Sequence, residues 1–230
     1  MPEPLRLPAL YAIVDPLDTG RAPEDLAAAY LAGGARLLQL RMKHATSREL
    51  LRAAERIVAL ARGVGALFVV NDRPDVARAV DADGVHLGQD DLSVAAARRV
   101  VGPNRLVGVS THDLAEARAA LDAGADYIGV GPIYTTASKE RALPARGLAL
   151  VEAVRAEIRC PMVAIGGITA ETAPAVRAAG ADAVAMIAAL ARAADPTAEV
   201  RRVIAAISGA PIPPRPPSRP PARPRGSRSA

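Results

Sequence analysis

Ala123-Gly124-Ala125-Asp126 leads directly into the apolar run at residues 127–131. Similar joints recur at residues 32–35, 81–84 and 179–182. A glycine just past a helix end supplies a left-handed cap, and the following strand begins within a few residues. The repetition therefore predicts a series of helix-to-strand turns of one kind.

Short apolar runs rich in β-branched residues alternate along the chain with longer segments of helical period. We expect strands at residues 10–14, 37–41, 67–70, 84–87, 106–109, 127–131, 162–165 and 183–186. We expect helices at residues 23–32, 47–61, 74–80, 93–100, 113–123, 148–157, 170–179 and 197–207. This alternation is typical of βα units on a parallel sheet.

Eight βα units without a break in composition indicate an α/β protein with a single (β/α)8 barrel, a TIM barrel, over residues 1–208. The alternative is a doubly wound open sheet. That fold calls for Gly-x-Gly-x-x-Gly after the first strand, where residues 15–22 contain only Gly20. Residues 209–230 form a Pro/Arg-rich tail, and its proline density predicts an extended, disordered segment.

The net positive charge belongs to the tail and not to the barrel. The formal net charge of the 230 residues is +5, and residues 211–230 hold five Arg and no acid. Subtracting these five from the 29 basic residues leaves 24, which matches the 24 acidic residues. With one Phe, four Tyr and no Trp, the chain also offers few surfaces for base stacking. Nucleic acid is therefore a disfavoured partner.

No segment of the sequence predicts secretion or a membrane span. The first residues lack a basic region followed by an apolar one, and no run of about 18 apolar residues is uninterrupted. Cys160 has no second cysteine to pair with, and we expect it to be a small core or edge residue. These features favour a cytoplasmic protein without a membrane partner.

Scarce polar residues gather where the expected strands end, which is where (β/α)8 barrels carry their active sites. Only Lys43 and Lys139 are lysines among the 29 basic residues, and both fall there. The strand ends supply Asp15, Gln39, Arg41, Lys43, Asn71, Asp72, His86, Gln89, Asp90, Asp91, Ser110, Thr111, His112 and Lys139. This clustering predicts a polar active site at the carboxyl end of the barrel.

Gln39, Arg41 and Lys43 occupy alternate positions and therefore share one face of a strand. Polar donors in line are costly to bury unless an anion meets them, so they predict an anion site. The alternative is a structural ion pair with Asp72 or Asp91.

Asp72 and Asp91 end neighbouring strands and could together hold a hard cation. Carboxylates with water and a phosphate suit Mg²⁺. The alternative is helix capping, because Asp91 lies two residues before Ser93.

Gly166-Gly167, with Ile187-Ala188 after the last strand, occupies the place where such barrels bind phosphate through backbone N–H groups. Turn formation alone also explains a glycine pair. Two anion sites on one rim suggest a reaction that joins a diphosphate and a monophosphate.

Six motifs in order, over residues 10–207, resemble the thiamine phosphate synthase family. They are Gln39-Leu40-Arg41-Met42-Lys43, Val70-Asn71-Asp72-Arg73, residues 83–91, Gly108-Val109-Ser110, residues 129–134 with Lys139, and residues 164–169. The resemblance implies a transferase that joins hydroxymethylpyrimidine diphosphate to a thiazole phosphate. In this family Mg²⁺-bound diphosphate leaves first, and the thiazole nitrogen traps the pyrimidine cation.

The resemblance also implies roles for individual residues. The pyrimidine diphosphate would be bound by Gln39, Leu40, Arg41, Met42, Lys43, Asn71, Ser110 and Lys139, among which Arg41, Lys43, Ser110 and Lys139 would be catalytic. One Mg²⁺ per subunit would be bound by Asp72 and Asp91. The thiazole phosphate would be bound by Thr136, Ala137, Ser138, Gly167, Ile187 and Ala188.

The chain departs from the family pattern at Ala188, where serine is common, and at Glu140-Arg141, where the family has Lys-Asp. One alternative function is that of a related thiazole tautomerase, with His112 as general acid/base. Another is a non-catalytic phosphate-binding barrel whose tail recruits a partner. The sequence leaves open the state of homo-oligomerisation, the role of the tail and whether the thiazole is carboxylated.

Overall fold

Eight parallel strands close into a barrel in the order in which they follow one another along the chain. The structure is a computed structural model that describes residues 5–136 and 144–209. The strands are β1 (Leu10–Val14), β2 (Leu37–Leu40), β3 (Leu67–Asn71), β4 (Gly84–Leu87), β5 (Leu106–Thr111), β6 (Tyr127–Val130), β7 (Met162–Ile165) and β8 (Ala183–Met186). The predicted (β/α)8 architecture is confirmed.

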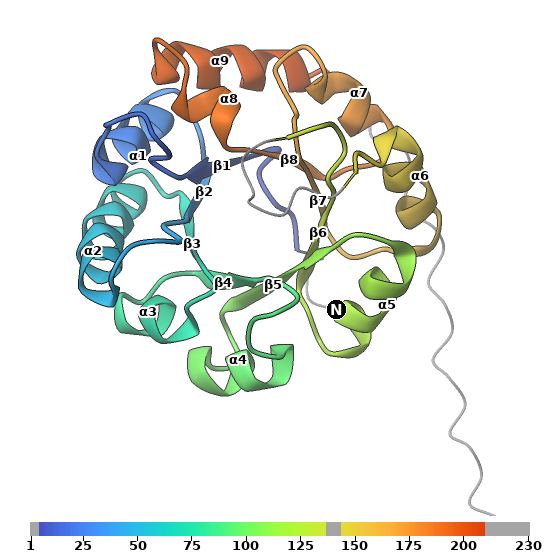
Figure 1. The fold of residues 1–230 in the computed structure, drawn as a ribbon, viewed down its shortest axis with the longest axis horizontal. Coiled ribbons are helices and arrows are strands. Elements are labelled where there is room, and N and C mark those ends of the chain that lie inside the picture. The colour runs from blue at the N-terminus through green and yellow to red at the C-terminus, as the bar shows by residue number, and fades with distance from the viewer. Residues whose placement is uncertain (1–4, 137–143, 210–230) are drawn as a thin grey trace, which may run out of the picture.

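Helices surround this barrel as an outer ring (Figure 1). In the described part of the chain they are α1 (Pro23–Ala32), α2 (Ser47–Gly63), α3 (Pro74–Ala79), α4 (Val94–Val101), α5 (Leu114–Asp122), α6 (Gly147–Glu157), α7 (Ala173–Ala178), α8 (Ala188–Ala191) and α9 (Pro196–Ile207). Residues 210–230, which carry almost all of the predicted tail, lie outside the described residues.

The expected elements differ from the observed ones mainly around the last two βα units. Helix α7 begins three residues later than expected, because the hydroxyl of Thr172 accepts the N–H of Thr169 (2.9 Å) and holds a turn before the helix. Helix α8 is absent from the sequence-based prediction. A single turn of four residues has no helical period that a sequence pattern could reveal.

The helix-to-strand joints have the predicted left-handed residue, with one correction. Gly34, Gly124 and Gly180 have φ angles of 105°, 92° and 117°. In the joint at residues 81–84 the left-handed residue is Asp81 (φ 56°) and not Gly84. Aspartate tolerates this conformation better than most side chains. Gly84 lies inside β4, where a Cβ atom would come within 2.5 Å of the carbonyl oxygen of Leu106.

An aspartate in three of these joints ties neighbouring strands together at the amino end of the barrel. Asp83, Asp126 and Asp182 accept the backbone N–H of Phe68, Val107 and Met162, at 2.7–2.8 Å, with their Oδ2 atoms. Arginines add ion pairs to two of them: Arg98 to Asp126 and Arg155 to Asp182, both at 2.6 Å. The joint motif therefore holds the barrel together as well as turning the chain.

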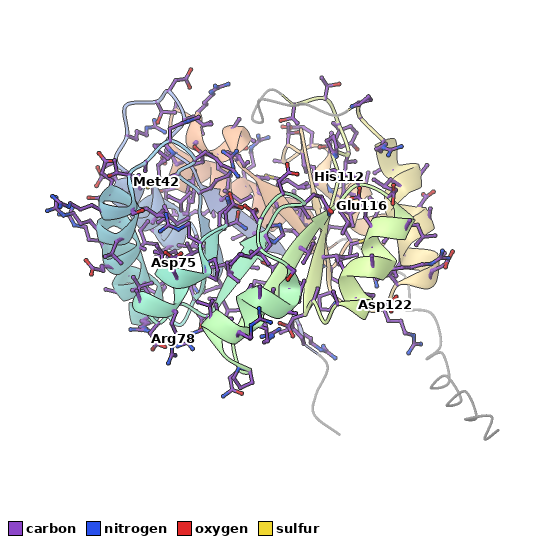
Figure 2. All side chains as sticks on the ribbon, turned by 60° about the horizontal axis from the view of Figure 1, so that its bottom comes forward. Met42, Asp75, Arg78, His112, Glu116 and Asp122 are labelled. Atoms are coloured by element: carbon purple, nitrogen blue, oxygen red, sulfur yellow. The ribbon has the colours of Figure 1, made fainter. Side chains whose placement is uncertain are left out.

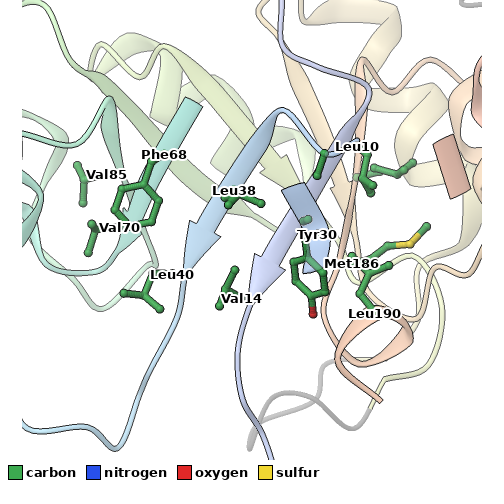
Figure 3. Close-up of a cluster of buried hydrophobic side chains, with 14 of the residues drawn as sticks. Leu10, Val14, Tyr30, Leu38, Leu40, Phe68, Val70, Val85, Met186 and Leu190 are labelled. Atoms are coloured by element: carbon green, nitrogen blue, oxygen red, sulfur yellow. The ribbon is translucent and has the colours of Figure 1, made fainter. Parts of the chain in front are cut away.

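Strand side chains alternate between two apolar layers. Leu38 and Leu40 of β2 point outward, into the layer that Tyr30 of α1 and Leu190 of α8 also enter (Figure 3). Leu37 belongs to the inner layer, together with Tyr11, Ile13, Val69, Tyr127, Val163, Ala183, Ala185 and Ile187. The barrel interior is therefore a packed core whose upper boundary is the floor of the site.

Two expectations concern single features of the chain. Cys160 is half-buried and packs against the outer apolar layer, as expected for an edge residue. Among the described helices, none combines the length and the apolar character needed to cross a membrane.

Candidate active site

A cleft of about 1100 Å³ opens at the carboxyl end of the barrel. Eight residues predicted for the site line it: Asp15, Arg41, Met42, Lys43, Asn71, Asp72, Asp90 and Ser110. Figure 2 places Met42 at this end of the molecule, while Arg78 and Asp122, at the ends of α3 and α5, lie at the other. The carboxyl ends of β3 and β5 and the segments after β2 and β3 thus deliver polar side chains to one opening.

A smaller cavity of about 40 Å³ extends from this region into the barrel. Gln39, Arg41, Asn71 and Ser110 line it, so Gln39 and Arg41 share the inward face of β2, as their spacing predicts. Leu40 points the opposite way and is fully buried in the outer layer. Its side chain therefore contributes packing and does not line either cavity.

Arg41 is held by Asp15, the residue that follows β1. Its Nη1 atom forms an ion pair with Asp15 Oδ2, while Asp15 Oδ1 accepts the N–H of Leu17 (3.1 Å). The alternative of a structural ion pair with Asp72 or Asp91 therefore does not apply to Arg41. Strand β2 lies between β1 and β3, and the Arg41 side chain turns toward β1. The ion pair leaves most of the guanidinium N–H donors available.

Lys43 forms an ion pair with Asp72, as one of the sequence-based alternatives proposed. Asp72 has a left-handed backbone (φ 62°), and its N–H donates to the carbonyl of His86 (2.8 Å). The Asp72 carboxylate lies close enough to that of Asp91 for the two to influence each other. Burial first, and then the neighbouring Asp91 carboxylate, raise the pKa of Asp72, whereas Lys43 lowers it.

Asp91 does not cap the helix that follows it. Its Oδ2 atom accepts the N–H of Gly88 (2.6 Å), and the cap of α4 is Ser93, whose hydroxyl accepts the N–H of Ala96 (3.3 Å). The capping alternative is therefore wrong, and the Asp91 carboxylate is oriented toward Asp72 by its own loop.

The adjoining carboxylates of Asp72 and Asp91 fit a hard divalent cation. Two acidic groups held together in a partly buried place raise the pKa of one of them, and a cation would relieve that repulsion. The described residues contain no group of three or more His, Cys, Asp or Glu side chains placed to hold a metal. The pair therefore suits an ion that completes its shell with water and phosphate, as Mg²⁺ does.

The loops after β6 and β7 pack tightly against each other. The N–H of Tyr134 donates to the carbonyl of Gly166 (2.9 Å). Gly167 has φ 63°, and a Cβ atom there would lie 2.5 Å from the carbonyl oxygen of Thr135. Glycine is required by both observations. The structure thereby brings Gly167 beside the segment that contains Thr136.

The remaining residues predicted for the thiazole phosphate are only partly described. Ile187 lines the smaller cavity, and Ala188 is the first residue of α8. Ala137, Ser138 and Lys139 lie outside the described residues, as does the Glu140-Arg141 departure.

The loop after β1 is tied to the segment that follows α8, a link that the sequence did not reveal. Arg21 Nη1 donates to the carbonyls of Ala191 (2.9 Å) and Ala193 (2.8 Å). Asp18 and Arg192, which both line the cleft, form an ion pair at 3.0 Å. These contacts cross the seam where β1 meets β8, so no local pattern could have predicted them.

His112 is bound to the first turn of α5. Its Nδ1 atom lies 2.9 Å from Glu116 Oε2, and its backbone N–H donates to the same oxygen (2.8 Å). Figure 2 shows the two side chains together. Glu116 N–H in turn donates to Asp113 (2.9 Å). His112 is not among the residues that line the two cavities, and its geometry is that of a helix-start residue.

Two buried residues beneath the cleft, Tyr11 and Tyr127, were not predicted for the site, and they lie beside His86, which was. Tyr127 Oη lies 3.0 Å from Tyr11 Oη and 3.1 Å from His86 Nδ1. Gly108 makes room for them, since a Cβ atom there would lie 2.0 Å from the ring of Tyr127. The sequence did offer a signal for this cluster. Tyr11 and Tyr127 occupy inward positions of β1 and β6, where a phenol hydroxyl is a buried polar group in an otherwise apolar barrel interior.

The barrel and its charged cleft place this protein among (β/α)8 proteins that carry their active site at the carboxyl ends of the strands. The family model described as thiamine monophosphate synthase matches residues 10–190. The chain belongs to this family, and it is an enzyme.

Individual relatives agree with the family. A thiamine-phosphate synthase from Anaeromyxobacter dehalogenans is 50% identical over 201 residues, covering 87% of this chain and 88% of the relative. One from Chloroflexus aurantiacus is 46% identical over 200 residues, covering 86% and 92%. Among solved structures, thiamine phosphate pyrophosphorylase from Pyrococcus furiosus superposes with a TM-score of 0.80 at 34% identity, covering 87% of this chain and 95% of that one.

Proposed function

We propose that this enzyme joins 4-amino-2-methyl-5-hydroxymethylpyrimidine diphosphate to a thiazole phosphate, with thiamine phosphate and diphosphate as products. The observation that carries the proposal is the meeting of Arg41, Lys43 and Asp72 in one cleft, with the Asp91 carboxylate acting on Asp72 from beside it. The cationic side chains suit the diphosphate oxygens, and the two carboxylates suit the Mg²⁺ that accompanies a diphosphate.

In the proposed reaction, the bond between the pyrimidine methylene carbon and the diphosphate oxygen breaks first. The electron pair leaves with the diphosphate, and the methylene carbon becomes cationic. The thiazole nitrogen then donates its lone pair to that carbon, and the positive charge ends on the thiazolium ring. No proton needs to move, so the reaction requires no general base.

Arg41 and Lys43 would bind the diphosphate oxygens and stabilise the charge that develops as they leave. Asp15 supports this role because its ion pair fixes the direction of the Arg41 guanidinium while leaving other N–H donors available. Lys139, on a segment outside the described residues, is proposed as a third cation. Ser110 and Asn71 line both cavities, where they would contact the pyrimidine half.

Asp72 and Asp91 would hold one Mg²⁺ through carboxylate oxygens. When bound, the ion neutralises part of the diphosphate charge and so makes it a better leaving group. Lys43 is already beside Asp72, which places a cation next to the same oxygens.

We assign the thiazole phosphate to the opposite side of the opening, at Thr136, Ala137, Ser138, Gly167, Ile187 and Ala188. The close packing of Gly167 against the backbone of Thr135 supports this assignment. Because glycine has no side chain, a phosphate can approach the backbone N–H groups there. At Ala188 only the backbone N–H would be available to the phosphate.

Purified full-length protein incubated with each substrate alone and with both would test the proposal. We expect diphosphate release only when both are present, and its loss on addition of EDTA. Restoration by Mg²⁺ controls for nonspecific effects of the chelator. Isomerisation of a thiazole phosphate without diphosphate release would instead support a tautomerase, although His112 is not among the residues that line the two cavities.

Replacement of Lys139 by alanine would test whether this lysine is the third cation that binds the diphosphate. We expect turnover to fall far more than it does when an arginine on a helix face, such as Arg52, is replaced. Unchanged turnover in Lys139→Ala would show that the cation site is misplaced.

A further inference from the structure

A continuous chain of hydrogen bonds runs through the barrel interior beneath the cleft. Gln39 Nε2 donates to Tyr11 Oη (2.8 Å), and Tyr11 Oη lies 3.0 Å from Tyr127 Oη. Tyr127 Oη lies 3.1 Å from His86 Nδ1, and His86 Nε2 lies 3.0 Å from Ser110 Oγ. The series of hydrogen bonds begins at Gln39 and ends at Ser110, and both line the smaller cavity, as do Tyr11 and His86.

The members of this chain are shielded from solvent. Tyr11 and Tyr127 are each 1% exposed, Gln39 is 3% exposed and His86 is 9% exposed. In such a place each polar group depends on its neighbour, because an unpaired group would cost free energy. Burial raises the pKa of both tyrosines, so both phenols keep their protons at neutral pH.

The direction of the chain follows from its first link. Tyr11 accepts from Gln39, and because its own buried proton also needs an acceptor, Tyr11 donates to Tyr127, its other partner. Tyr127 then donates to His86 Nδ1, which must lack a proton, and the ring proton lies on Nε2. His86 therefore donates to Ser110 Oγ.

This polarity determines what the two ends present to the cavity. Because Ser110 Oγ already accepts from His86, its own proton is free to be donated to a ligand. At the other end, Gln39 uses Nε2 in the chain, and among the described residues nothing donates to its carbonyl oxygen. The cavity thus offers one donor and one acceptor whose roles are linked through three intervening side chains.

We propose that Tyr11, Tyr127 and His86 are positioning residues that set Ser110 as donor and Gln39 as acceptor, and so select a heteroaromatic ring with an amino group next to a ring nitrogen. Such a ring accepts from Ser110 at its nitrogen and donates to Gln39 from its amino group. This proposal rests on the proposed function, since the aminopyrimidine half of that substrate has this pattern.

The tautomer of His86 tests the direction of the chain without any need for turnover. The full chain contains three histidines, so comparison of 15N-labelled wild type with His86→Asn assigns the His86 ring signals. We expect a neutral ring with its proton on Nε2 and an accepting Nδ1. A proton on Nδ1 would reverse the chain and overturn the proposal.

Kinetics of Tyr127→Phe test whether the chain positions the ring. We expect KM for the pyrimidine diphosphate to rise about tenfold, the loss typical of one broken hydrogen bond in a buried chain. KM for the thiazole phosphate and inhibition by inorganic pyrophosphate with Mg²⁺ should stay within about twofold. Tyr11→Phe breaks a neighbouring link and should behave alike.

Tyr30→Phe is the matched control. Tyr30 is also fully buried, and its hydroxyl has no hydrogen-bond partner among the described residues, so all these constants should stay unchanged. If Tyr127→Phe and Tyr11→Phe leave KM for the pyrimidine unchanged, or weaken pyrophosphate binding equally, the positioning role is wrong. If wild type releases no diphosphate at all, the proposed function is wrong instead. The tautomer of His86 would still show whether the hydrogen bonds run in the inferred direction.

Discussion

The two ends of the barrel both carry aspartate–cation pairs, but the pairs differ in how completely their atoms are used. At the amino end, Arg155 donates Nη2 to Asp182 (2.6 Å), Nε to the carbonyl of Gly180 (2.8 Å) and Nη1 to that of Ile158 (2.9 Å). At the carboxyl end, Lys43 meets Asp72, and 45% of its side chain remains exposed.

The difference separates a structural ion pair from a binding group. Arg155 is 4% exposed with all three guanidinium nitrogens donating, and its partner Asp182 also accepts the N–H of Met162, so the pair is buried among structural contacts. Lys43 and Asp72 keep donors and acceptors that face an open cleft. The same kind of aspartate–cation pair therefore stabilises the fold where it is buried among structural contacts. It can bind a ligand where it faces an open cleft.

The largest expected effect is loss of stability in Arg155→Ala. Removing one partner of a buried pair costs about 3–5 kcal/mol, since the remaining carboxylate stays buried. In a barrel of this size we expect Tm to fall by about 10 °C in thermal unfolding. Arg118→Ala, which breaks the exposed pair with Glu157, is the control and should cost about 0.5 kcal/mol. Equal losses in both variants would remove the distinction between saturated and exposed pairs.

Lys43→Ala should show the opposite pattern. We expect kcat/KM to fall by about 10²–10³, the usual loss when one group that stabilises developing negative charge is removed. Tm should change little, because the side chain is exposed. Steady-state kinetics and thermal unfolding of the same preparation measure both, and Arg48→Ala on the exposed face of α2 controls for loss of a positive charge. A large fall in Tm with unchanged kcat/KM would assign Lys43 to the structural class.

Asp72→Asn should weaken the response to Mg²⁺ while sparing the fold. Asparagine tolerates the left-handed backbone at this position. The raised pKa of Asp72 means that the folded state holds this proton more tightly than the unfolded state. The cost of ionising Asp72 therefore appears as pH rises from the ordinary carboxyl pKa through the raised one.

Since asparagine cannot ionise, metal-free Asp72→Asn should gain in Tm relative to wild type as the pH rises from about 4 to about 7. Added Mg²⁺ should raise the Tm of wild type and have little effect on the variant. A Tm difference that is independent of pH, together with an unchanged Mg²⁺ response, would contradict a carboxylate cation site.

The smallest effect is expected for Arg202→Ala, on the outer surface. Arg202 pairs with Glu171 and Glu199, and it is the main reason why the pKa of Glu171 falls to about 2. A lowered carboxyl pKa contributes stability above its ordinary value, and that contribution disappears as pH falls toward 2. The difference in Tm between wild type and variant should be small at pH 7 and should shrink on acidification and in high salt. A difference that grows in acid would contradict this assignment.

Much of the architecture could be predicted because its causes are local. The apolar run of β8 and the glycine-containing joint before it specify a strand whatever lies elsewhere in the chain. Residues at the carboxyl ends of the strands were correctly expected to converge, since a parallel barrel brings those ends together. The shared inward face of Gln39 and Arg41 followed from the two-residue period of a strand, whereas Leu40, expected to bind substrate, is buried in the outer layer.

Partners could not be predicted, because they depend on distances that the chain alone does not contain. Arg41 lies between strands that offer Asp15 on one side and Asp72 on the other, and only the direction of its side chain selects Asp15. Tyr11 and Tyr127 are 116 residues apart, and their hydrogen bond exists because both point into the same barrel. Asp91 orients toward Asp72 through its loop rather than through helix capping.

The sequence by itself determined the repeating unit, the closed set of eight strands and the chemical character of the rim, because periodicity and turn residues act over a few residues. Tertiary structure alone decided which charges saturate each other and which stay open, and it joined Gln39 to Ser110 through the barrel interior. The physical reason is that a hydrogen bond or an ion pair requires its atoms within about 3 Å, and only closure of the barrel brings distant strands that close.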